Sequence, residues 1–255
     1  MLSNTDIVIL AGGLGKRLQT ITQGKQKVLA DIDGKPFIAL LIEFIASQGA
    51  KRFILCTGHG AEDVKQALAG MFPKLEILFS IEQEPLGTGG AIKQGAALVR
   101  SPKFIAMNGD CFCVIDYQKL IEQHAAQKAA ATIAITKVDD AREYGTIEVD
   151  AQGRIKAFKE KSASAELLSR LPAGQAGSAS ADKQPQYLIN TGTYCLNKDV
   201  FNMVKTPAKF SIEYDFFPHL VGKGFASFEV PNKFIDIGTT ERYQWAREHL
   251  KEFRP

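Results

Sequence analysis

The 255-residue chain lacks several features that would by themselves assign it to a functional class. It has only four cysteines, Cys56, Cys111, Cys113 and Cys195, and they form no pair of CxxC units of the kind that binds zinc. We expect them to be reduced thiols. No apolar run approaches the roughly 18 residues of a membrane span, and no charged segment followed by an apolar one opens the chain. The sequence therefore predicts a soluble, cytoplasmic protein with no membrane partner.

The net charge of the chain is also small. The chain has 31 lysines and arginines against 28 acidic residues, a net charge of +3, and it contains no basic run. This balance disfavours a nucleic-acid partner. The four histidines show no spacing that suits metal ligands, so we assign them no role. Hydrophobic content of 45% is ordinary for a globular protein, and the length suffices for one sizeable α/β domain.

Apolar and amphipathic segments alternate in the first half of the chain. This alternation is typical of right-handed βαβ units, so we predict a three-layer α/β/α, Rossmann-like fold with a mostly parallel central sheet. We expect one domain over residues 1–255, with a β-rich second half from residue 131 and a flexible loop at about 162–186. The predicted strands are 5–10, 52–56, 75–80 and 103–108, and the predicted helices are 37–48, 61–69, 88–99, 116–128, 197–204, 213–221 and 240–251.

A glycine-rich basic segment, LAGGLGKRL, directly follows the first predicted strand. Gly12, Gly13 and Gly15 allow a tight turn that a ligand can approach closely. Free backbone N–H groups in such a turn suit a phosphate, and Lys16 and Arg17 add positive charge beside it. The segment predicts a nucleotide-binding loop at the carboxyl end of the first strand, where ligands of such sheets lie.

Two known phosphate-binding motifs do not match this segment. A Walker A loop requires Ser or Thr after its lysine, where this chain has Arg17. The dinucleotide fingerprint would require glycine at the position of Leu18. The loop therefore predicts phosphate binding without identifying the reaction.

Two aspartates, Asp110 and Asp236, lie at or within predicted strands, where a carboxylate can indicate a metal site. The predicted strand 103–108 runs into Asn108-Gly109-Asp110, which places a carboxylate at the carboxyl end of the sheet. Asp236 lies between two isoleucines, and a carboxylate in a buried strand needs an ion or a metal as partner. Carboxylates together with phosphate oxygens and water are the ligands of Mg²⁺. A simple turn remains the alternative for Gly109-Asp110.

The segment Glu82-Gln83-Glu84-Pro85-Leu86-Gly87-Thr88-Gly89-Gly90 follows a predicted strand and opens a predicted helix. Glycines and a hydroxyl at a helix start suit contact with an anion. The alternative is that Thr88 only caps the helix.

These segments, taken in order, resemble the sugar-1-phosphate nucleotidyltransferase family, also called nucleotide-sugar pyrophosphorylases. The matching stretches are LAGGLGKRL, EPLGTGGAI, NGD, YGT, FKEK, INTG and FIDIGT, and the resemblance spans residue 7 to about 250. Lys16 departs from the usual threonine, and Lys27 lacks its usual flanking prolines, so Lys25 is an alternative to Lys27. The resemblance implies transfer of a nucleoside monophosphate from a nucleoside triphosphate to a sugar 1-phosphate, with Mg²⁺ as cofactor and pyrophosphate as product.

Residue roles follow from the resemblance, position by position. It implies a nucleotide-binding half, 1–130, and a sugar-phosphate-binding half, 131–255. The implied catalytic residues are Arg17, Lys27, Asp110 and Lys161, and the implied metal ligands are Asp110 and Asp236. The implied nucleotide contacts are Leu10, Gly12, Gly13, Gly15, Lys16, Glu82, Gly87 and Thr88, and the implied sugar contacts are Asn108, Gly145, Glu160 and Asn190.

Glu82 favours guanine as the base. Guanine offers two adjacent donors, and a carboxylate, which only accepts, can take both. The stretches EQEPLGTGGAI, YGTIEVD and INTGTY resemble the guanylyltransferase branch that takes D-glycero-α-D-manno-heptose 1-phosphate. A guanylyltransferase for mannose 1-phosphate, a uridylyltransferase and a catalytically silent nucleotide-sugar-binding regulatory subunit remain alternatives. The sequence leaves the oligomeric state open.

Overall fold

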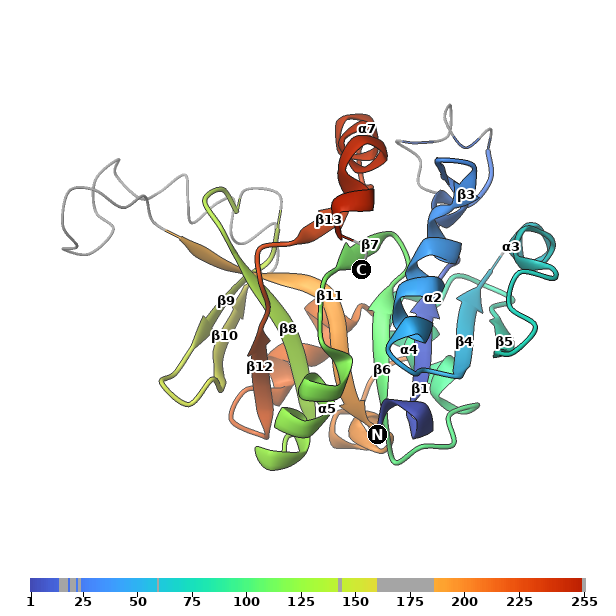
Figure 1. Cartoon of the computed structure of the whole chain (residues 1–255). Helices are drawn as coiled ribbons and strands as arrows, with labels where there is room; N and C mark the ends of the chain where they lie inside the picture. The colour runs from blue at the N-terminus through green and yellow to red at the C-terminus, as the bar shows by residue number, and fades with distance from the viewer. Residues whose placement is uncertain are drawn as a thin grey trace.

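The computed structural model forms a central sheet with helices on both faces (Figure 1). The main sheet has nine strands, in which the order β10-β9-β11-β6-β1-β4-β5 is joined by β8 and β12. The residues that the structure describes are 1–13, 18, 22, 24–58, 60–141, 144–159 and 186–253.

Five predicted site residues lie outside the described part of the chain. They are Gly15, Lys16, Arg17, Glu160 and Lys161. Nearly all of the predicted flexible loop, 162–186, lies outside it as well.

Four parallel strands form the part of the sheet that positions the site. They are β1 (Asp6–Leu10), β4 (Arg52–Thr57), β5 (Glu76–Ile81) and β6 (Lys103–Asn108). β1 lies between β4 and β6, and β4 pairs with β5. These bounds agree with the predicted strands to within one residue at each end, because each strand is a short run of apolar residues.

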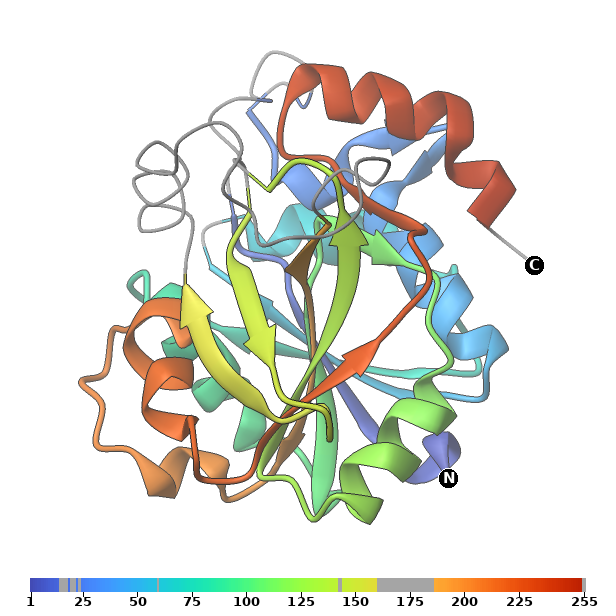
Figure 2. The same ribbon diagram turned by 90° about the vertical axis from the view of Figure 1, so that its left-hand side faces the viewer.

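The alternation of side chains along β1 explains why the sheet needs two helical layers. Ile7 and Ile9 pack on one face and Val8 packs on the other, all fully buried. The first face is covered by α2 (Phe37–Ser47), α3 (Ala61–Leu68) and α5 (Tyr117–Ala126). The second face is covered by α4 (Gly87–Ala96) and the segment around 200–220. Figure 2 shows α2 and α5 on one side of the sheet and the 200–220 segment on the other.

The second half of the chain extends the same sheet mainly by antiparallel pairing, although β12 pairs parallel with β8. Its strands are β8 (Ala131–Val138), β9 (Thr146–Val149), β10 (Ile155–Lys159), β11 (Tyr187–Asn197) and β12 (Phe225–Glu229). β11 pairs antiparallel with β6 and so joins the two halves. Its pairing with β8 shifts between Asn190 and Tyr194, where Gly192 has a positive φ of 72°.

Two short sheets lie beside the main one. β2 (Asp31–Ile32) pairs with β3 (Lys35–Pro36), and β7 (Cys111–Cys113) pairs with β13 (Phe234–Asp236). β13 leads into the terminal helix α7 (Thr240–His249), which lies above it in Figure 1 and ends in the 3₁₀ turn η7 (Leu250–Phe253). Among the described residues of the first half, η1 (Leu2–Asn4) and η3 (Lys27–Leu29) are 3₁₀ turns.

The predicted helix 197–204 is wrong. β11 continues to Asn197, which pairs with Lys103, so only the 3₁₀ turn η4 (Val200–Met203) follows. The predicted helix 213–221 is a π-helical turn, η5 (Ile212–Phe216), followed by the 3₁₀ turn η6 (Phe217–Leu220). Pro218 lies in the first turn of η6 and lacks the N–H that a continuing helix requires.

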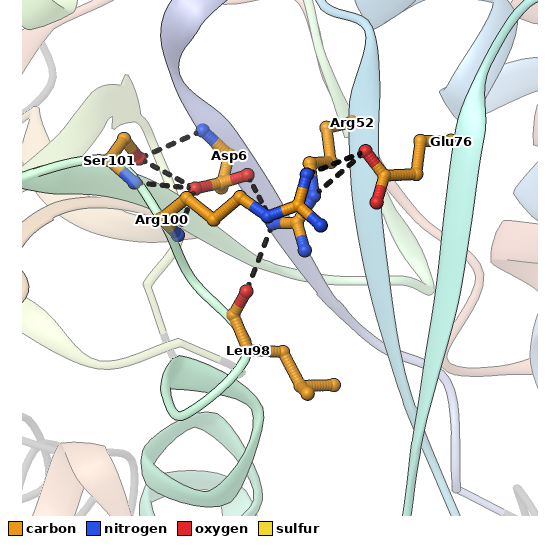
Figure 3. Close-up of polar contacts among 6 residues, drawn as sticks. All are labelled: Asp6, Arg52, Glu76, Leu98, Arg100 and Ser101. Carbon is orange, nitrogen blue, oxygen red and sulfur yellow. Dashed lines mark hydrogen bonds and ion pairs between the residues drawn. The ribbon is translucent and has the colours of Figure 1, made fainter.

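The amino ends of the parallel strands are closed by a network of charges (Figure 3). Asp6 is 4% exposed, and its Oδ1 accepts from Arg52 Nη1 at 2.6 Å. Its Oδ2 accepts from the backbone N–H groups of Arg100 and Ser101 and from the Ser101 hydroxyl, at 2.7 to 2.9 Å. Glu76 pairs with both arginines. The network ties the first residues of β1, β4 and β5 to the segment that enters β6.

Two further findings concern the cysteines and the helices. All four cysteines are free thiols. Within the described residues, no helix is both long and apolar enough to cross a membrane.

Candidate active site

A cavity of about 560 Å³ opens at the carboxyl ends of β1, β4, β5 and β6. This is the opposite edge of the sheet from the Asp6 network, and it is where ligands of open α/β sheets bind. The segments after all four strands contribute to its wall. Its lining includes these predicted site residues: Leu10, Gly12, Gly13, Lys27, Glu82, Gly87, Thr88, Asn108 and Asp110.

Glycines let the backbones at this edge come close together. Gly109 N–H donates to the Leu10 carbonyl at 2.9 Å, and a Cβ on Gly109 would collide with the same oxygen. A Cβ on Gly12 would lie 3.1 Å from the Gly58 nitrogen. Gly13 faces open space, and its carbonyl accepts from Lys27 N–H at 3.2 Å. Glycine backbone therefore forms part of the cavity wall, where a phosphate chain can approach closely.

Lys27 and Asp110 form an ion pair in the cavity. Lys27 begins the turn η3, and its Nζ lies 2.5 Å from Asp110 Oδ2, with the side chains 11% and 32% exposed. Asp110 Oδ1 also accepts from the Cys111 thiol at 3.4 Å. Of the two lysines considered in this loop, Lys27 lines the cavity and Lys25 does not.

Asp236 lies beside Asp110 on the neighbouring short sheet. It is opposite Cys111 in the β7–β13 pair, and Ile237 N–H donates to the Asp110 carbonyl at 3.0 Å. Asp236 Oδ2 pairs with Arg242 Nη1 at 2.5 Å, and Oδ1 accepts from Gly238 N–H at 2.6 Å. The expectation that Asp236 needs a charged partner is thus met by an arginine of α7. Asp236 is not in the wall of the main cavity.

Tyr144 covers this ion pair. The Arg242 guanidinium lies over the Tyr144 ring, 5.0 Å from its centroid, and Phe234 packs edge-on against the same ring. Burial, and then the negative charge of Asp236, raise the pKa of the Tyr144 hydroxyl to about 12, so it stays protonated at neutral pH. Arg242 was not among the predicted residues, because nothing in its helical sequence connects it to Asp236.

The donor set at Asp110 and Asp236 fits a hard divalent cation. Within the described ranges, no three or more His, Cys, Asp and Glu side chains gather as a complete ligand set. Two carboxylates suit Mg²⁺, which keeps water and takes phosphate oxygens for its remaining positions. Burial, and then the charges of Asp110 and Asp236, raise the pKa of Cys111 well above its usual value. The thiol therefore stays protonated and offers no thiolate for a softer metal.

Glu82 lies in the cavity wall on the loop after β5. Its backbone N–H donates to the Thr57 carbonyl at 2.8 Å, and its Oε2 accepts from Leu86 N–H at 2.9 Å. The carboxylate thus closes the turn of its own loop while it faces the cavity. The sequence argument on the base did not foresee the contact with Leu86.

Thr88 is not the cap of α4, so that alternative is wrong. The helix begins at Gly87, and Leu86, at the N-cap position, makes no side-chain cap. The Thr88 hydroxyl accepts from Ile212 N–H at 3.0 Å and donates to Glu213 Oε2 at 2.6 Å. It therefore joins the start of α4 to the π-helical turn η5, a contact between residues 125 apart that the sequence does not reveal.

The described residues that were predicted to contact the sugar lie on and beside β11. Asn190 N–H donates to the Gly145 carbonyl at 3.4 Å, which brings these two together. Asn108, in the cavity wall, lies so close to Gly192 that a Cβ there would be 2.6 Å from Asn108 Nδ2. Asn190 and Gly145 are outside the wall of the main cavity, next to it along β11.

The chain matches known proteins over nearly its whole length. A family model described as nucleotidyl transferase matches residues 6–252. The chain belongs to the nucleotidyl transferase family. It is 34% identical over 249 residues to the D-glycero-α-D-manno-heptose 1-phosphate guanylyltransferase of Aneurinibacillus thermoaerophilus, a match that covers 97% of this chain and 99% of the relative. The mannose-1-phosphate guanyltransferase of Pichia angusta is 32% identical, and there the match covers 91% of this chain but only 60% of the relative.

A solved structure supports the same assignment of this nucleotidyl transferase. The crystal structure of HddC from Yersinia pseudotuberculosis complexed with GMP-PN has a TM-score of 0.77 and 35% identity, and covers 96% of this chain and 99% of that one. The family and the three-layer, mostly parallel α/β fold predicted from the sequence are therefore confirmed.

Proposed function

We propose that this nucleotidyl transferase transfers GMP from GTP to D-glycero-α-D-manno-heptose 1-phosphate and releases pyrophosphate. The observation that carries the proposal is the cavity, which groups the acceptor-only carboxylate of Glu82 with the charged pair Lys27 and Asp110. One end of the cavity then suits a base and the other suits phosphates. The near full-length likeness to a heptose 1-phosphate guanylyltransferase supports the choice of sugar.

The reaction needs positioning and charge neutralisation more than covalent help from the protein. A phosphate oxygen of the sugar 1-phosphate, already ionised, attacks the α-phosphorus of GTP in line. The new bond joins that oxygen to the α-phosphorus, and the bond from the α-phosphorus to the bridging oxygen of pyrophosphate breaks. No proton must be removed, so no general base is required. We propose that Lys27 neutralises charge on the nucleotide phosphates.

Asp110 and Asp236 are the residues proposed to hold Mg²⁺. Bound there, the ion would supply neutralisation of phosphate charge and polarisation of the phosphorus–oxygen bonds. In the structure each carboxylate faces one cation, Lys27 or Arg242. We propose that Arg17 and the glycine-rich loop hold the pyrophosphate and that Lys161 positions the attacking phosphate. The roles of Arg17 and Lys161 rest on the sequence resemblance alone.

Glu82 is proposed to recognise guanine. A carboxylate offers about four lone-pair sites, so the hydrogen bond from Leu86 leaves room for the two adjacent donors of guanine. That same bond fixes the direction of the carboxylate before the nucleotide arrives, which lowers the entropy cost of binding. Uracil has one donor between two acceptors and would set an acceptor against a carboxylate.

The sugar is proposed to bind along β11, with Asn190 donating to or accepting from a hydroxyl and Gly145 allowing close approach. Asn108 lies where the cavity meets this side and is proposed to contact the sugar as well. Four free thiols suit a reducing compartment, so we propose that the enzyme acts in the cytoplasm.

The test is pyrophosphate release with Mg²⁺, in which GTP, UTP, CTP, ATP and dTTP are crossed with a panel of sugar 1-phosphates. The panel includes the heptose and mannose compounds. Release with GTP and the heptose compound alone supports the proposal. Release with mannose 1-phosphate favours the alternative function, a mannose-1-phosphate guanylyltransferase, which the likeness to the Pichia angusta enzyme supports. Release with UTP contradicts the role of Glu82. Nucleotide binding without release in any pair favours a regulatory subunit.

A further inference from the structure

A chain of hydrogen bonds runs from the nucleotide cavity to the proposed sugar side, and Glu213 stands in its middle. Thr88, in the cavity wall, donates to Glu213 Oε2 at 2.6 Å. Tyr194 Oη donates to Glu213 Oε1 at 3.3 Å. Asn190 Nδ2 donates to the same Tyr194 oxygen at 3.0 Å. Glu213 therefore accepts from the nucleotide side through Oε2 and from the sugar side through Oε1.

The direction of every bond at Glu213 is fixed. Its Oε2 also accepts from the Ser211 hydroxyl at 2.8 Å, and that hydroxyl oxygen accepts from the backbone N–H groups of Glu213 and Tyr214 at 3.2 Å. The Thr88 hydroxyl accepts from Ile212 N–H, so its proton must point to Glu213. Three hydroxyl donors thus converge on one group, and only a side chain without donors can accept all three.

The two residues on the sugar side of this hydrogen-bond series, Tyr194 and Asn190, are held firmly. Tyr194 is fully buried, and its ring packs edge-on against Phe217 at 4.9 Å between centroids. Its hydroxyl accepts from Asn190, so its own proton is directed to Glu213. Asn190 is held at its other atom too, because its Oδ1 accepts from Gly192 N–H at 2.8 Å. The amide of Asn190 is therefore held by Gly192 at Oδ1 and by Tyr194 at Nδ2.

We infer that Glu213 is a positioning residue that sets Thr88 for the nucleotide and Asn190 for the sugar 1-phosphate at the same time. The inference rests on the proposed function only for the names of the two substrates. Glu213 itself is not in the wall of the cavity. It acts through Thr88 on one side and through Tyr194 on the other, across the boundary between the two halves of the chain.

Three variants distinguish the two arms of this hydrogen-bond series, the nucleotide arm through Thr88 and the sugar arm through Tyr194 and Asn190. Glu213→Gln replaces one acceptor oxygen with an NH₂ donor, so it disturbs both arms. Tyr194→Phe keeps the buried ring and removes only the hydroxyl that links Glu213 to Asn190. Thr88→Val removes only the hydroxyl on the nucleotide arm. The matched control is Asp215→Asn, which changes a carboxylate of the same helical turn that accepts from Ser211 N–H at 2.7 Å.

The measurements are the Kd of GTP by calorimetry without sugar, and the KM of the sugar 1-phosphate and kcat by pyrophosphate release. We expect Glu213→Gln to raise both the Kd of GTP and the KM of the sugar 1-phosphate about three- to tenfold, which is the usual contribution of one hydrogen bond. Tyr194→Phe should raise only the KM of the sugar 1-phosphate, and Thr88→Val should raise only the Kd of GTP. Asp215→Asn should leave both within twofold, even where its Tm falls as far as that of Glu213→Gln.

Two results would overturn the inference. One is a Glu213→Gln protein that has a lower Tm but both constants within twofold of the wild type. The other is a Tyr194→Phe protein in which GTP binding weakens as much as the sugar constant rises, since the arms would then not be separate. If Glu213→Gln does not fold, the contrast between Tyr194→Phe and Thr88→Val still decides. If the proposed function is wrong, the wild-type protein itself releases no pyrophosphate with GTP and the heptose compound. The Kd of GTP can still be compared between the variants, because measuring it requires no catalysis.

Discussion

The two ends of the parallel strands carry similar charged residues and use them in opposite ways. At the amino ends, Asp6 is almost fully buried and accepts four hydrogen bonds. At the carboxyl ends, the charged partner of Asp110 is one lysine and that of Asp236 is one arginine. The Asp6 carboxylate accepts four hydrogen bonds and is closed off from ligands. Asp110 accepts from Lys27 and Cys111 and is 32% exposed beside the cavity, so a ligand can reach it.

The surroundings of the two edges differ in the same sense. Asp6, Arg52, Arg100 and Ser101 border a hollow of about 250 Å³, and Arg52 and Glu76 face each other in the register of β4 and β5. The carboxyl edge has a larger cavity of about 560 Å³, whose wall includes glycine backbone. A fully satisfied polar network is rigid and costly to disturb, whereas a half-satisfied one is costly unless a ligand completes it. The comparison indicates that an aspartate contributes to stability at one edge and to chemistry at the other.

The largest expected effect is on catalysis at Asp110. Asp110→Ala should lower kcat by at least ~10²-fold, the scale for removing a preorganised charge-stabilising group. Pyrophosphate release measures it. The Tm should fall less than in a variant of Asp6, because the Asp110 side chain is 32% exposed whereas that of Asp6 is 5% exposed. Near-normal turnover would contradict its assignment as a metal ligand.

The opposite pattern is expected at Asp6. Asp6→Asn should lower the free energy of unfolding by about 3 kcal/mol, because it removes a buried charge that pairs with Arg52 and accepts four hydrogen bonds. Urea unfolding measures this. Both kcat and KM should remain those of the wild type at 25 °C, since the network lies at the far edge of the sheet. A variant with normal stability and reduced turnover would remove the distinction between the two edges.

The pH dependence of stability sharpens the same comparison. Burial alone would raise the pKa of Asp6, but the hydrogen bonds from Ser101, Arg52 and Arg100 outweigh it, so the pKa lies below its usual value. Ionised Asp6 therefore stabilises the fold fully above about pH 4, the pKa of an unfolded aspartate, and this contribution is lost as the pH falls further. The stability difference between wild type and Asp6→Asn should shrink between pH 5 and pH 3. A constant difference over that range would contradict the assignment.

A smaller effect is expected on base choice at Glu82. Glu82→Gln should reduce the preference for GTP over UTP by about 1–3 kcal/mol, the range for one bidentate contact with a base. The ratio of kcat/KM values for the two nucleotides measures it. Glu84→Gln is the matched control, because Glu84 lines the same cavity on the same loop. A larger loss of preference in the Glu84 variant would transfer base recognition to that residue.

The smallest effect is expected at Arg242. Arg242→Gln removes the cation that pairs with Asp236, so the magnesium concentration for half-maximal rate should fall about fivefold, as expected if a partly exposed ion pair is worth about 1 kcal/mol. Arg247→Gln removes the same charge from an exposed position of the same helix and should leave that concentration unchanged. If both variants behave alike, the effect is one of overall charge.

The sequence predicted the parts of the site that depend on local chemistry. Apolar runs that end in glycine and acid located β1 and β6, and with them Gly12 and Asp110. Lys27 and Glu82 were named from the resemblance to the family, and both line the cavity at the carboxyl edge. Gly15, Lys16, Arg17, Glu160 and Lys161 stay predictions, and so do the roles of all the site residues.

The sequence could not predict partners that tertiary packing brings together. Arg242 reaches Asp236 only because α7 follows β13 at a particular angle, and Glu213 reaches Thr88 across 125 positions of chain. The predicted helix 197–204 was wrong for the same reason, because pairing of β11 with β6 continues the strand to Asn197. At Asn197 a non-local strand pairing outweighed the local propensity.

The seam between β6 and β11 makes this chain a candidate for a split enzyme. Residues 103–107 of one strand pair with 193–197 of the other, and that ladder joins the two halves of the main sheet. A cut near residue 130 would give two fragments, each with one exposed apolar strand edge. Such edges associate with a partner or aggregate. Co-expressed fragments should therefore recover activity through this ladder, whereas each fragment alone should precipitate.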